Sequence, residues 1–277
     1  MSGRSFVPML LGFGCSVPAI MASRTLSGTR ERKLTVLLTP FLSCSAKLPV
    51  YGMIASVFFP DQTGFVVVCI YGIGVLAAIM TATMIKSLIS SWEEPTFVME
   101  LPVYRIPVAD NIVRLIWEKV KDFVKKAFTI IFLGSIFIWF MQYYTPAFQP
   151  ASNPRQSILA WIGSAFAPIF MPAGFGDYRA VAAILTGLTA KETVVSTLTI
   201  LLGGKDGSLY ALQELFTVPS ALSFLTFIAL YMPCIAAFAA EKRELGWKTA
   251  IKFCLYQTVI AYFFAIIVYR LAVCFIG

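Results

Sequence analysis

The sequence predicts an all-α, polytopic helical membrane protein with about eight transmembrane segments and with broken helices. Of its 277 residues, 58% are hydrophobic and only 13% are charged, and the mean hydropathy is +0.81, which lies outside the usual range for a soluble domain of this length. The apolar residues also form long runs, many close to the roughly 20 residues that a helix needs to cross the hydrocarbon core of a bilayer.

The apolar runs give eight candidate spans, at residues 5–23, 34–59, 64–85, 127–144, 157–171, 178–202, 219–240 and 249–274. The fifth run is short and contains Pro168. A re-entrant or half-length segment is therefore as good an interpretation of it as a full crossing.

The basic residues give the expected orientation. The formal charge is +8, but Lys and Arg gather in the connectors between apolar runs, so membrane topology explains the charge and no nucleic-acid partner is expected. Alternating the eight spans puts the three basic groups, at residues 24–33, 86–126 and 242–248, on one side. The connectors at 61–62, 144–156 and 203–218 fall on the other side, so we expect the basic side to be cytoplasmic.

The stretch before the fourth span differs from the spans. Residues 92–107 are rich in Glu and Pro and predict a linker. Residues 111–126 alternate apolar and charged side chains at helical spacing, which predicts an amphipathic helix that lies on the cytoplasmic surface and runs into the fourth span. This helix is either an interfacial anchor or a docking surface for a partner.

Two segments near the N-terminus combine helix-breaking residues with polar side chains at membrane depth. Glycine and proline free backbone carbonyls and amides, and polar groups there are costly unless they face protein or water. The first segment contributes Gly12, Gly14, Cys15, Ser16 and Pro18, and the second contributes Ser43, Cys44, Ser45, Lys47 and Pro49. Close helix packing around small residues and a buried structural cysteine is the alternative interpretation.

Two later segments repeat this pattern. Lys191 and Glu192 lie near the middle of the sixth span, where ionisable groups cost most. Adjacent helical residues do not face each other, so we expect separate partners: a metal, Lys47 or backbone amides for Glu192, and carbonyls for Lys191. Pro233 and Cys234 then form another cysteine at a proline break. Broken helices in corresponding places of two halves are typical of a transport site.

The donor set favours a borderline divalent metal. Cys15, Cys44 and Cys234 offer sulfur and Glu192 offers a carboxylate, which suits a transition metal better than Mg²⁺ or Ca²⁺. We expect these four residues to line the metal pathway and to meet at one site. The sequence contains no His, which excludes imidazole-rich metal enzymes and His-based triads. The other cysteines, Cys69, Cys254 and Cys274, have no neighbouring break and are expected to be packing residues.

The segments 12–24, 43–51, 174–179, 189–198 and 231–244, taken in order, resemble the membrane portion of the ferrous iron transport protein B family. The resemblance covers nearly the whole chain. It implies uptake of Fe²⁺ as transported substrate across the bacterial cytoplasmic (inner) membrane, through two gate regions. Cys15 and Cys44 then belong to the first gate, and Lys191, Glu192 and Cys234 to the second. The corresponding division is 1–90 for the first gate region, 91–126 for the linker and surface helix, and 127–277 for the central spans and second gate region.

The resemblance also implies partners. Family members usually begin with a GTP-binding domain, yet this sequence has no Gly-x-x-x-x-Gly-Lys-Ser/Thr loop. We therefore expect no GTP site and no enzyme activity in this chain, with the GTPase either an upstream part of a longer protein or a separate subunit. A small cytosolic accessory protein, a homo-oligomer and membrane lipid are further expected partners.

Two other functions stay open from the sequence. Helix breaks and polar midplane groups also serve carriers of small organic solutes of the nucleoside type. Alternatively, the chain is a membrane scaffold that transports nothing and docks a GTPase through residues 111–126.

Overall fold

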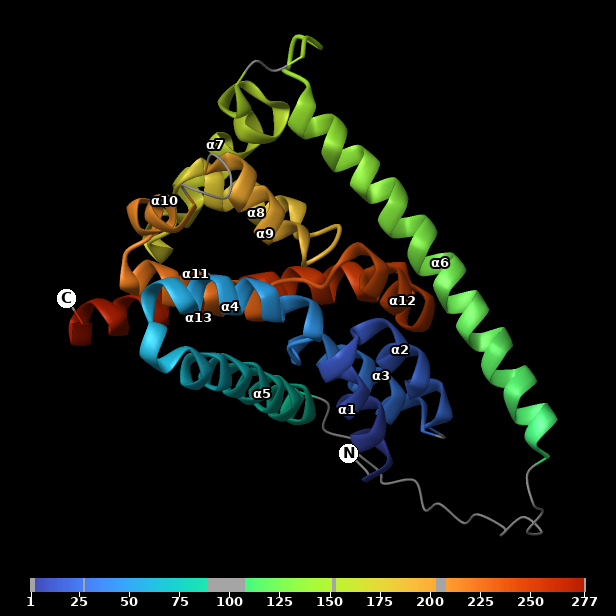
Figure 1. Ribbon diagram of the computed structural model, residues 1–277. Helices are drawn as coiled ribbons and strands as arrows, with labels where there is room; N and C mark the ends of the chain where they lie inside the picture. Colours follow the sequence, from blue (N-terminus) through green and yellow to red (C-terminus); the bar gives the residue numbers. More distant parts are fainter. Residues whose placement is uncertain (1–2, 27, 89–107, 151–152, 203–207, 277) are drawn as a thin grey trace.

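The computed structural model describes all residues except 1–2, 27, 89–107, 151–152, 203–207 and 277. The regular structure of the described residues is helical, in agreement with the predicted class (Figure 1). The α-helices are α1 (Phe6–Gly14), α2 (Ser16–Ala22), α3 (Thr29–Leu38), α4 (Leu48–Phe58), α5 (Thr63–Leu88), α6 (Ala109–Tyr143), α7 (Ile158–Phe170), α8 (Tyr178–Thr186), α9 (Thr193–Leu201), α10 (Ser208–Leu215), α11 (Val218–Leu230), α12 (Ile235–Leu245) and α13 (Trp247–Ile276). Short 3₁₀ helices are η1 (Gly3–Ser5), η2 (Ser23–Thr25), η3 (Thr39–Phe41), η4 (Ser45–Lys47), η5 (Pro60–Gln62), η6 (Pro154–Gln156) and η7 (Met171–Ala173).

Helix α11 forms the centre of the structure. It packs along α13 on one side and contacts α4 and α5 on others, so these four helices lie side by side (Figure 1). The segment α1–α3 gathers at one end of this layer with α12, and α7–α10 gathers at the other. The two predicted gate regions are therefore interleaved, because α12 contacts both α2 and α3.

The apolar helices fit a membrane protein, but the predicted number of spans is not established. Among the residues that the structure describes, four helical segments are long and apolar enough to cross a bilayer: Thr29–Phe58, Pro60–Ser87, Val218–Leu245 and Trp247–Phe275. A fifth candidate is the pair Ile158–Ala173 and Tyr178–Thr186, which is bent by 104° and forms a broken span or a re-entrant loop. This bend fits the alternative interpretation of 157–171, and the count of about eight stays a prediction.

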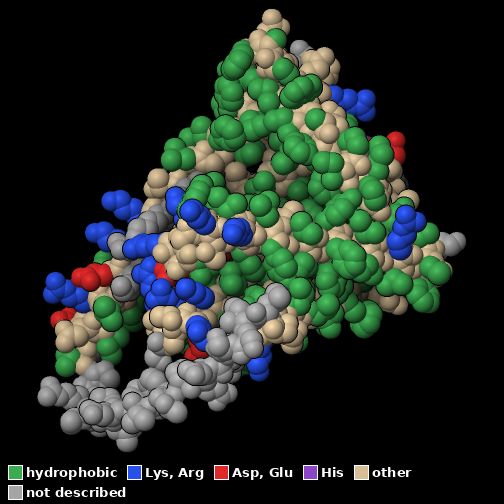
Figure 2. Space-filling view, turned by 180° about the vertical axis from the view of Figure 1, so that it is seen from behind, with side chains coloured by type: hydrophobic (Ala, Val, Ile, Leu, Met, Phe, Trp, Pro, Cys, Tyr) green, Lys and Arg blue, Asp and Glu red, His purple; other side chains and the backbone are tan. Residues whose placement is uncertain are grey.

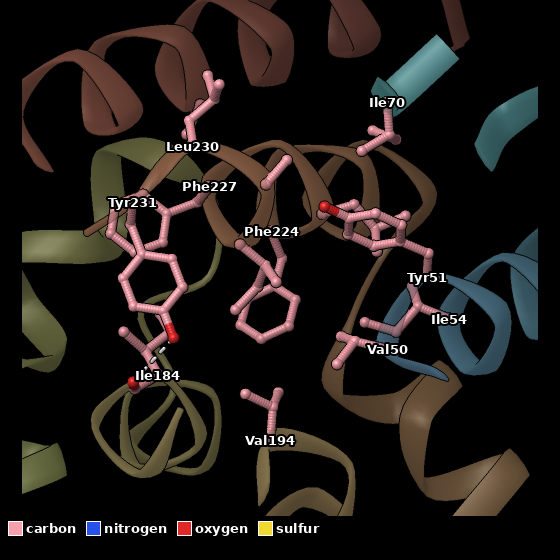
Figure 3. Packing of buried hydrophobic residues seen from close by; sticks show 14 of the residues in the cluster. Val50, Tyr51, Ile54, Ile70, Ile184, Val194, Phe224, Phe227, Leu230 and Tyr231 are labelled. Atoms are coloured by element: carbon pink, nitrogen blue, oxygen red, sulfur yellow. Dashed lines mark hydrogen bonds between the residues drawn. The ribbon is translucent and has the colours of Figure 1, made fainter. Parts of the chain in front are cut away.

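The core surrounds α11 because this helix is apolar on nearly every face. Its N-terminus is fixed by a capping box, in which Thr217 and Ser220 satisfy each other's backbone amides. Figure 3 shows side chains of α4, α5, α8 and α9 beside those of α11: Val50, Tyr51, Ile54, Ile70, Ile184 and Val194 come from the surrounding helices, Phe224, Phe227 and Leu230 come from α11, and Tyr231 follows its last residue. Gly74 of α5 allows a tight approach to η3, since a Cβ there would lie 2.7 Å from the carbonyl oxygen of Phe41.

Helix α6 is a single continuous helix of 35 residues. The prediction that the amphipathic stretch 111–126 runs into the fourth apolar stretch is confirmed, whereas the predicted linker 92–107 falls among the undescribed residues. At 1.5 Å per residue the helix is about 52 Å long, more than the roughly 30 Å of a hydrocarbon core. It contacts α7 and α12, and in its C-terminal half Gly134 approaches Thr189 and Gln142 donates to Thr197.

Basic side chains are distributed unevenly over the surface. Figure 2 shows Lys and Arg gathered at the end that carries α1–α3 and α12, while hydrophobic side chains cover much of the remaining face. Two of the predicted basic connectors meet at this end, because Arg24 and Arg32 both contact Glu244 of α12.

Candidate functional site

All four segments singled out in the sequence interrupt helices. Cys15 separates α1 from α2 with an extended backbone (φ −148°, ψ 130°). Cys44 lies between η3 and η4, and Cys234 directly precedes α12 after the gap that ends α11. The fourth break, at 187–192, separates α8 from α9. The helix breaks that the Gly and Pro residues predict are therefore confirmed.

The breaks are joined to one another by hydrogen bonds. Ser45 Oγ donates to the carbonyl of Gly14 at 2.8 Å, which links the second break to the first. The backbone amide of Ile235 donates to the carbonyl of Leu188 at 2.7 Å, which links the fourth segment to the third. Polar backbone groups freed by one break are thus satisfied by the next, as burial requires.

Both lysines are buried, and each donates a hydrogen bond to a backbone carbonyl at or just beyond the end of α11. Lys47 is 3% exposed, and its Nζ donates to the carbonyl of Ala229 at 2.6 Å. Lys191 is 2% exposed; its Nζ donates to the carbonyl of Met232 at 2.9 Å and lies 3.2 Å from the ring centroid of Tyr231. The prediction of a carbonyl partner for Lys191 is confirmed, and Lys47 likewise finds its partner inside the protein.

The cysteines of three breaks lie in the same region of the structure. Cys44, Cys234 and Glu192 are near enough to Cys15 for long-range electrostatic interaction, although no direct contact joins their side chains. Cys15 and Glu192 are exposed, whereas Cys44 and Cys234 are half-buried. Among the described residues, Glu192 has no hydrogen-bond or ion-pair partner, so Lys47 is not its counter-ion.

The described conformation does not bring these donors within reach of one ion. In the part of the chain that the structure describes, no three Cys, Asp or Glu side chains are grouped closely enough to hold a metal. A shared site for Cys15, Cys44, Cys234 and Glu192 therefore stays a prediction that requires movement of the broken helices.

Several of the supporting residues have packing roles. A Cβ on Gly12 would lie 3.3 Å from side-chain atoms of Leu42 and Thr39, so this glycine allows α1 to cross η3 closely. Ser43 is buried and its Oγ is 2.9 Å from the hydroxyl of Tyr51. Five others complete the local structure. A Cβ on Gly14 would meet no atom within 4 Å, Ser16 and Pro18 lie in α2, Pro49 is the second residue of α4, and Pro233 is buried in the last break.

An apolar cluster lies on the basic side of Cys234. Ile20 of α2, Val36 of α3 and Ala237 of α12 are buried together, and Cys234 packs against them. We call these three residues the apolar plug. Along α12, Ala237 lies between Cys234, which directly precedes the helix, and Glu244 near its end.

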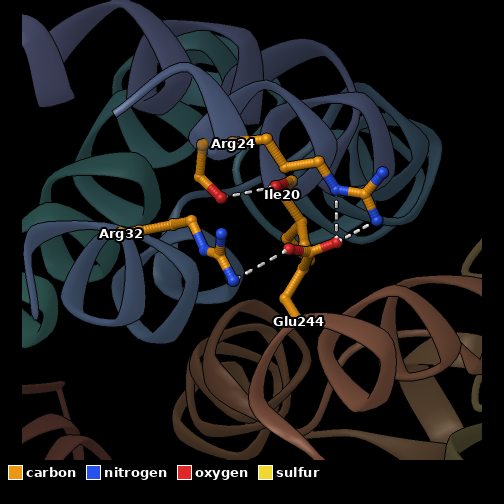
Figure 4. Close-up of polar contacts among 5 residues, drawn as sticks. Ile20, Arg24, Arg32 and Glu244 are labelled. Atoms are coloured by element: carbon orange, nitrogen blue, oxygen red, sulfur yellow. Dashed lines mark hydrogen bonds and ion pairs between the residues drawn. The ribbon is translucent and has the colours of Figure 1, made fainter. Parts of the chain in front are cut away.

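Beyond the plug, one carboxylate binds two arginines (Figure 4). The Glu244 side chain is only 4% exposed; Arg24 donates from Nε (2.7 Å) and Nη2 to Oε1, and Arg32 Nη2 lies 3.8 Å from Oε2. We call this group the Glu244 latch. Glu244 directly follows two basic residues and is not distinguished in the sequence from the charges of a surface connector, so the sequence does not predict this ion cluster.

Family models match most of the chain. Residues 1–58 and 124–248 match a model described as Gate, nucleoside recognition, and residues 67–119 match the ferrous iron transport protein B C terminus. No solved structure matches.

Curated relatives match along the whole chain. A protein named Fe(2+) transporter FeoB from Staphylococcus aureus (strain MSSA476) is 40% identical over 278 residues, covering 100% of this chain and 42% of the relative. The protein of the same name from Methanocaldococcus jannaschii is 38% identical over 274 residues, covering 96% and 41%. A Fe(2+) transport protein A/Fe(2+) transporter FeoB fusion protein from Porphyromonas gingivalis is 35% identical over 323 residues, covering 99% and 38%. The chain thus spans about two fifths of the length of these relatives. The ordered motifs, the apolar helices and these matches agree, and the chain belongs to the ferrous iron transport protein B family, of which it is a membrane portion.

Proposed function

We propose that this chain forms the membrane pathway for Fe²⁺, with Cys15, Cys44, Cys234 and Glu192 as the groups that contact the ion. The observation that carries the proposal is that three helix breaks, each with a cysteine, occur in the same region of the structure, where Ser45 beside Cys44 bonds to the carbonyl of Gly14 beside Cys15. The names of the curated relatives support Fe²⁺ as the cargo.

The charges of the site suit a divalent cation. Three thiolates and one carboxylate carry four negative charges, and the ammonium groups of Lys47 and Lys191 carry two positive charges, so two negative charges remain for the ion to balance. Because thiols bind metal as thiolates, entry of Fe²⁺ releases protons from the cysteines. The free-energy cost of removing water from the ion is offset by its bonds to the sulfur atoms, to the carboxylate and to the carbonyls at the breaks.

The described conformation corresponds to a closed state in this proposal. The apolar plug and the Glu244 latch lie between the cysteines and the basic end. We propose that the chain lies in the inner membrane of a bacterial cell and that its basic end faces the cytoplasm. Opening then needs α2 and α3 to move relative to α12. We propose that a GTP-binding domain or subunit drives or gates this movement, and that this chain hydrolyses no GTP itself. The fusion relative supports a small accessory protein as a further partner.

The test is uptake of ⁵⁵Fe²⁺ by the whole protein that contains this chain, in vesicles under reducing conditions. Cys15→Ser, Cys44→Ser, Cys234→Ser and Glu192→Ala should each reduce the uptake rate by at least tenfold at equal protein levels. Cys69→Ser and Cys274→Ser are the matched controls, since both cysteines are exposed on helices away from the breaks and should leave uptake unchanged. Normal uptake by all four site variants would overturn the assignment.

A second candidate is a carrier for a small organic solute of the nucleoside type, which the description of the larger matching family model favours. Competition distinguishes the two. A nucleoside mixture in excess should leave ⁵⁵Fe²⁺ uptake unchanged if the pathway carries iron, and radiolabelled nucleoside should accumulate only under the alternative. Absence of any uptake together with GTPase binding to residues 111–126 would instead support the scaffold interpretation.

A further inference from the structure

A second polar cluster lies between α12 and α13, away from the four breaks. Glu241 and Gln257 are both 0% exposed, and Cys254 is 5% exposed. Among the described residues, five buried side-chain atoms have no hydrogen-bond partner, and three of them are Glu241 Oε1 and both amide atoms of Gln257. The other Glu241 oxygen, Oε2, lies 3.8 Å from the sulfur of Cys254, whose thiol donates to it.

The helices place these three side chains in one seam. Ala250, Cys254, Gln257, Ala261 and Ala265 are buried at helical spacing along α13. Gln257 follows Cys254 by one turn, so the two share a face. Because Cys254 touches Glu241, this face points toward α12.

A buried carboxylate and a buried amide without hydrogen-bond partners lower the free energy of unfolding. A carboxylate taken out of water costs several kcal/mol unless a cation, a proton or hydrogen-bond donors compensate it. Among the described residues, the only partner of Glu241 is one weak thiol donor, and Gln257 has none. Buried polar groups are normally hydrogen-bonded, so this cluster requires an explanation, and a bound cation would satisfy the oxygens of both side chains.

The spacing fits a transition metal. A sulfur at about 2.3 Å and a carboxylate oxygen at about 2.1 Å from one ion are about 3.8 Å apart when the angle at the ion is near 120°. The measured separation between Cys254 Sγ and Glu241 Oε2 is 3.8 Å. A carboxylate, a thiolate and an amide oxygen form a mixed donor set that favours a borderline divalent metal over Mg²⁺ or Ca²⁺.

We propose that Glu241, Cys254 and Gln257 form a second binding site for a divalent transition metal, between the cysteines of the breaks and the basic end. The role of this second site, which is to bind the ion before it leaves the pathway at the basic end, rests on the proposed function. Glu241 lies on α12 about two turns from its start, where Cys234 directly precedes the helix, and Glu244 lies one turn further on. On binding, the ion replaces the thiol proton of Cys254, which leaves as H⁺.

The test is an anaerobic Co²⁺ titration of the purified protein in which Cys15, Cys44 and Cys234 are replaced by Ser, so that only the second site can supply a buried thiolate. Co²⁺ bound by one thiolate gives a charge-transfer band in the near ultraviolet. We expect saturation at one such ion per chain. Adding Cys254→Ser should abolish the band, and adding Glu241→Gln should weaken Co²⁺ binding at least tenfold. Cys274→Ser on the same helix is the matched control, because Cys274 is exposed and should leave the titration unchanged.

A measurement without substitutions guards against misfolded variants. Anomalous diffraction at the cobalt edge, from crystals of the unaltered protein soaked in Co²⁺, should show a peak between α12 and α13. No band and no peak there, or a band that survives Cys254→Ser, would overturn the second site while leaving the cysteine-dependent uptake test untouched. Conversely, normal uptake by the variants at the breaks would overturn the pathway but not a Cys254-dependent Co²⁺ site.

Discussion

Replacing Glu244 by Gln should open the basic side of the pathway. The substitution keeps the shape of the side chain but removes the charge that binds both Arg24 and Arg32. These arginines come from the α2–α3 side and Glu244 from α12, so the latch joins two parts of the chain that are far apart in sequence. Behind it, the apolar plug covers Cys234.

The size of the effect follows from the exposure of the three side chains. Glu244 is 4% exposed, whereas Arg24 and Arg32 are 40% and 36% exposed and can be solvated when released. The stabilising free energy that Glu244→Gln removes is therefore smaller than the 3–5 kcal/mol lost when a fully buried ion pair is broken. The two hydrogen bonds from Arg24 are charge-assisted and contribute about 1.5–3 kcal/mol, and the longer contact with Arg32 adds less than about 1 kcal/mol. A loss of about 2 kcal/mol shifts the ratio of open to latched molecules by about 30-fold.

The assay is the rate at which a membrane-impermeant maleimide, added from the basic side, modifies Cys234 in a background where it is the sole cysteine. Glu244→Gln should accelerate modification by about 10- to 30-fold. Raising the salt concentration should accelerate it in the unaltered latch, since half-exposed ion pairs are screened. Glu118→Gln is the matched control, because Glu118 pairs with Arg114 at 3.7 Å on the exposed surface of α6 and should change nothing.

An unchanged modification rate in Glu244→Gln would show that the contacts of Glu244 with Arg24 and Arg32 do not hold the basic side closed. The charge-swapped pair Arg24→Glu with Glu244→Arg gives an independent check. It should restore slow modification if the contact itself closes the basic side, and fast modification in the swapped protein would count against the latch.

Two further predictions concern packing. Gly74→Ala should lower the free energy of unfolding by about 1–3 kcal/mol, because its Cβ would lie 2.7 Å from the carbonyl oxygen of Phe41, whereas Gly72→Ala on the same helix meets no atom within 4 Å and should be neutral or slightly stabilising; thermal unfolding in detergent compares the two, and equal melting temperatures would contradict the close approach of α5 to η3. Thr197→Val should cost about 1–2 kcal/mol and increase hydrogen exchange in the C-terminal half of α6, since Thr197 bonds to α8 and accepts the hydrogen bond from α6. Thr199→Val, which removes a bond only to its own helix, should leave α6 exchange unchanged.

The parts of the fold that depend on local sequence could be predicted. Gly and Pro act on the backbone within one turn, so the breaks at Cys15, Cys44 and Cys234 were visible without any knowledge of packing. The membrane class followed from composition in the same way. The number of spans did not, because a length rule applied to 5–23 or 178–202 assumes a continuous helix and both stretches are broken into short pieces.

Contacts between distant segments could not be predicted. That Lys47 needs a partner inside the protein follows from its place in an apolar run, but the choice of the Ala229 carbonyl depends on how α11 ends 182 residues later. Likewise, Glu244 is buried only because α2 and α3 dock on α12, and its pairing with Arg24 spans 220 residues. Cys254 was expected to be a packing residue, and only its approach to Glu241 across the α12–α13 turn reveals a polar environment.

The two lysines at the end of α11 bear on which ions the pathway can admit. An ammonium group on a side chain is a cation that cannot diffuse away, so its local concentration at the Ala229 and Met232 carbonyls far exceeds that of any ion in solution. A monovalent ion carries the same charge as the lysine ammonium group but is not attached to the protein. Replacing the ammonium group by such an ion therefore gains no interaction free energy. A divalent ion interacts twice as strongly with the same carbonyls and with the cysteines beside them. The resident lysines would thus discriminate against Na⁺ and K⁺ by competition, without any need for a pore of a particular width.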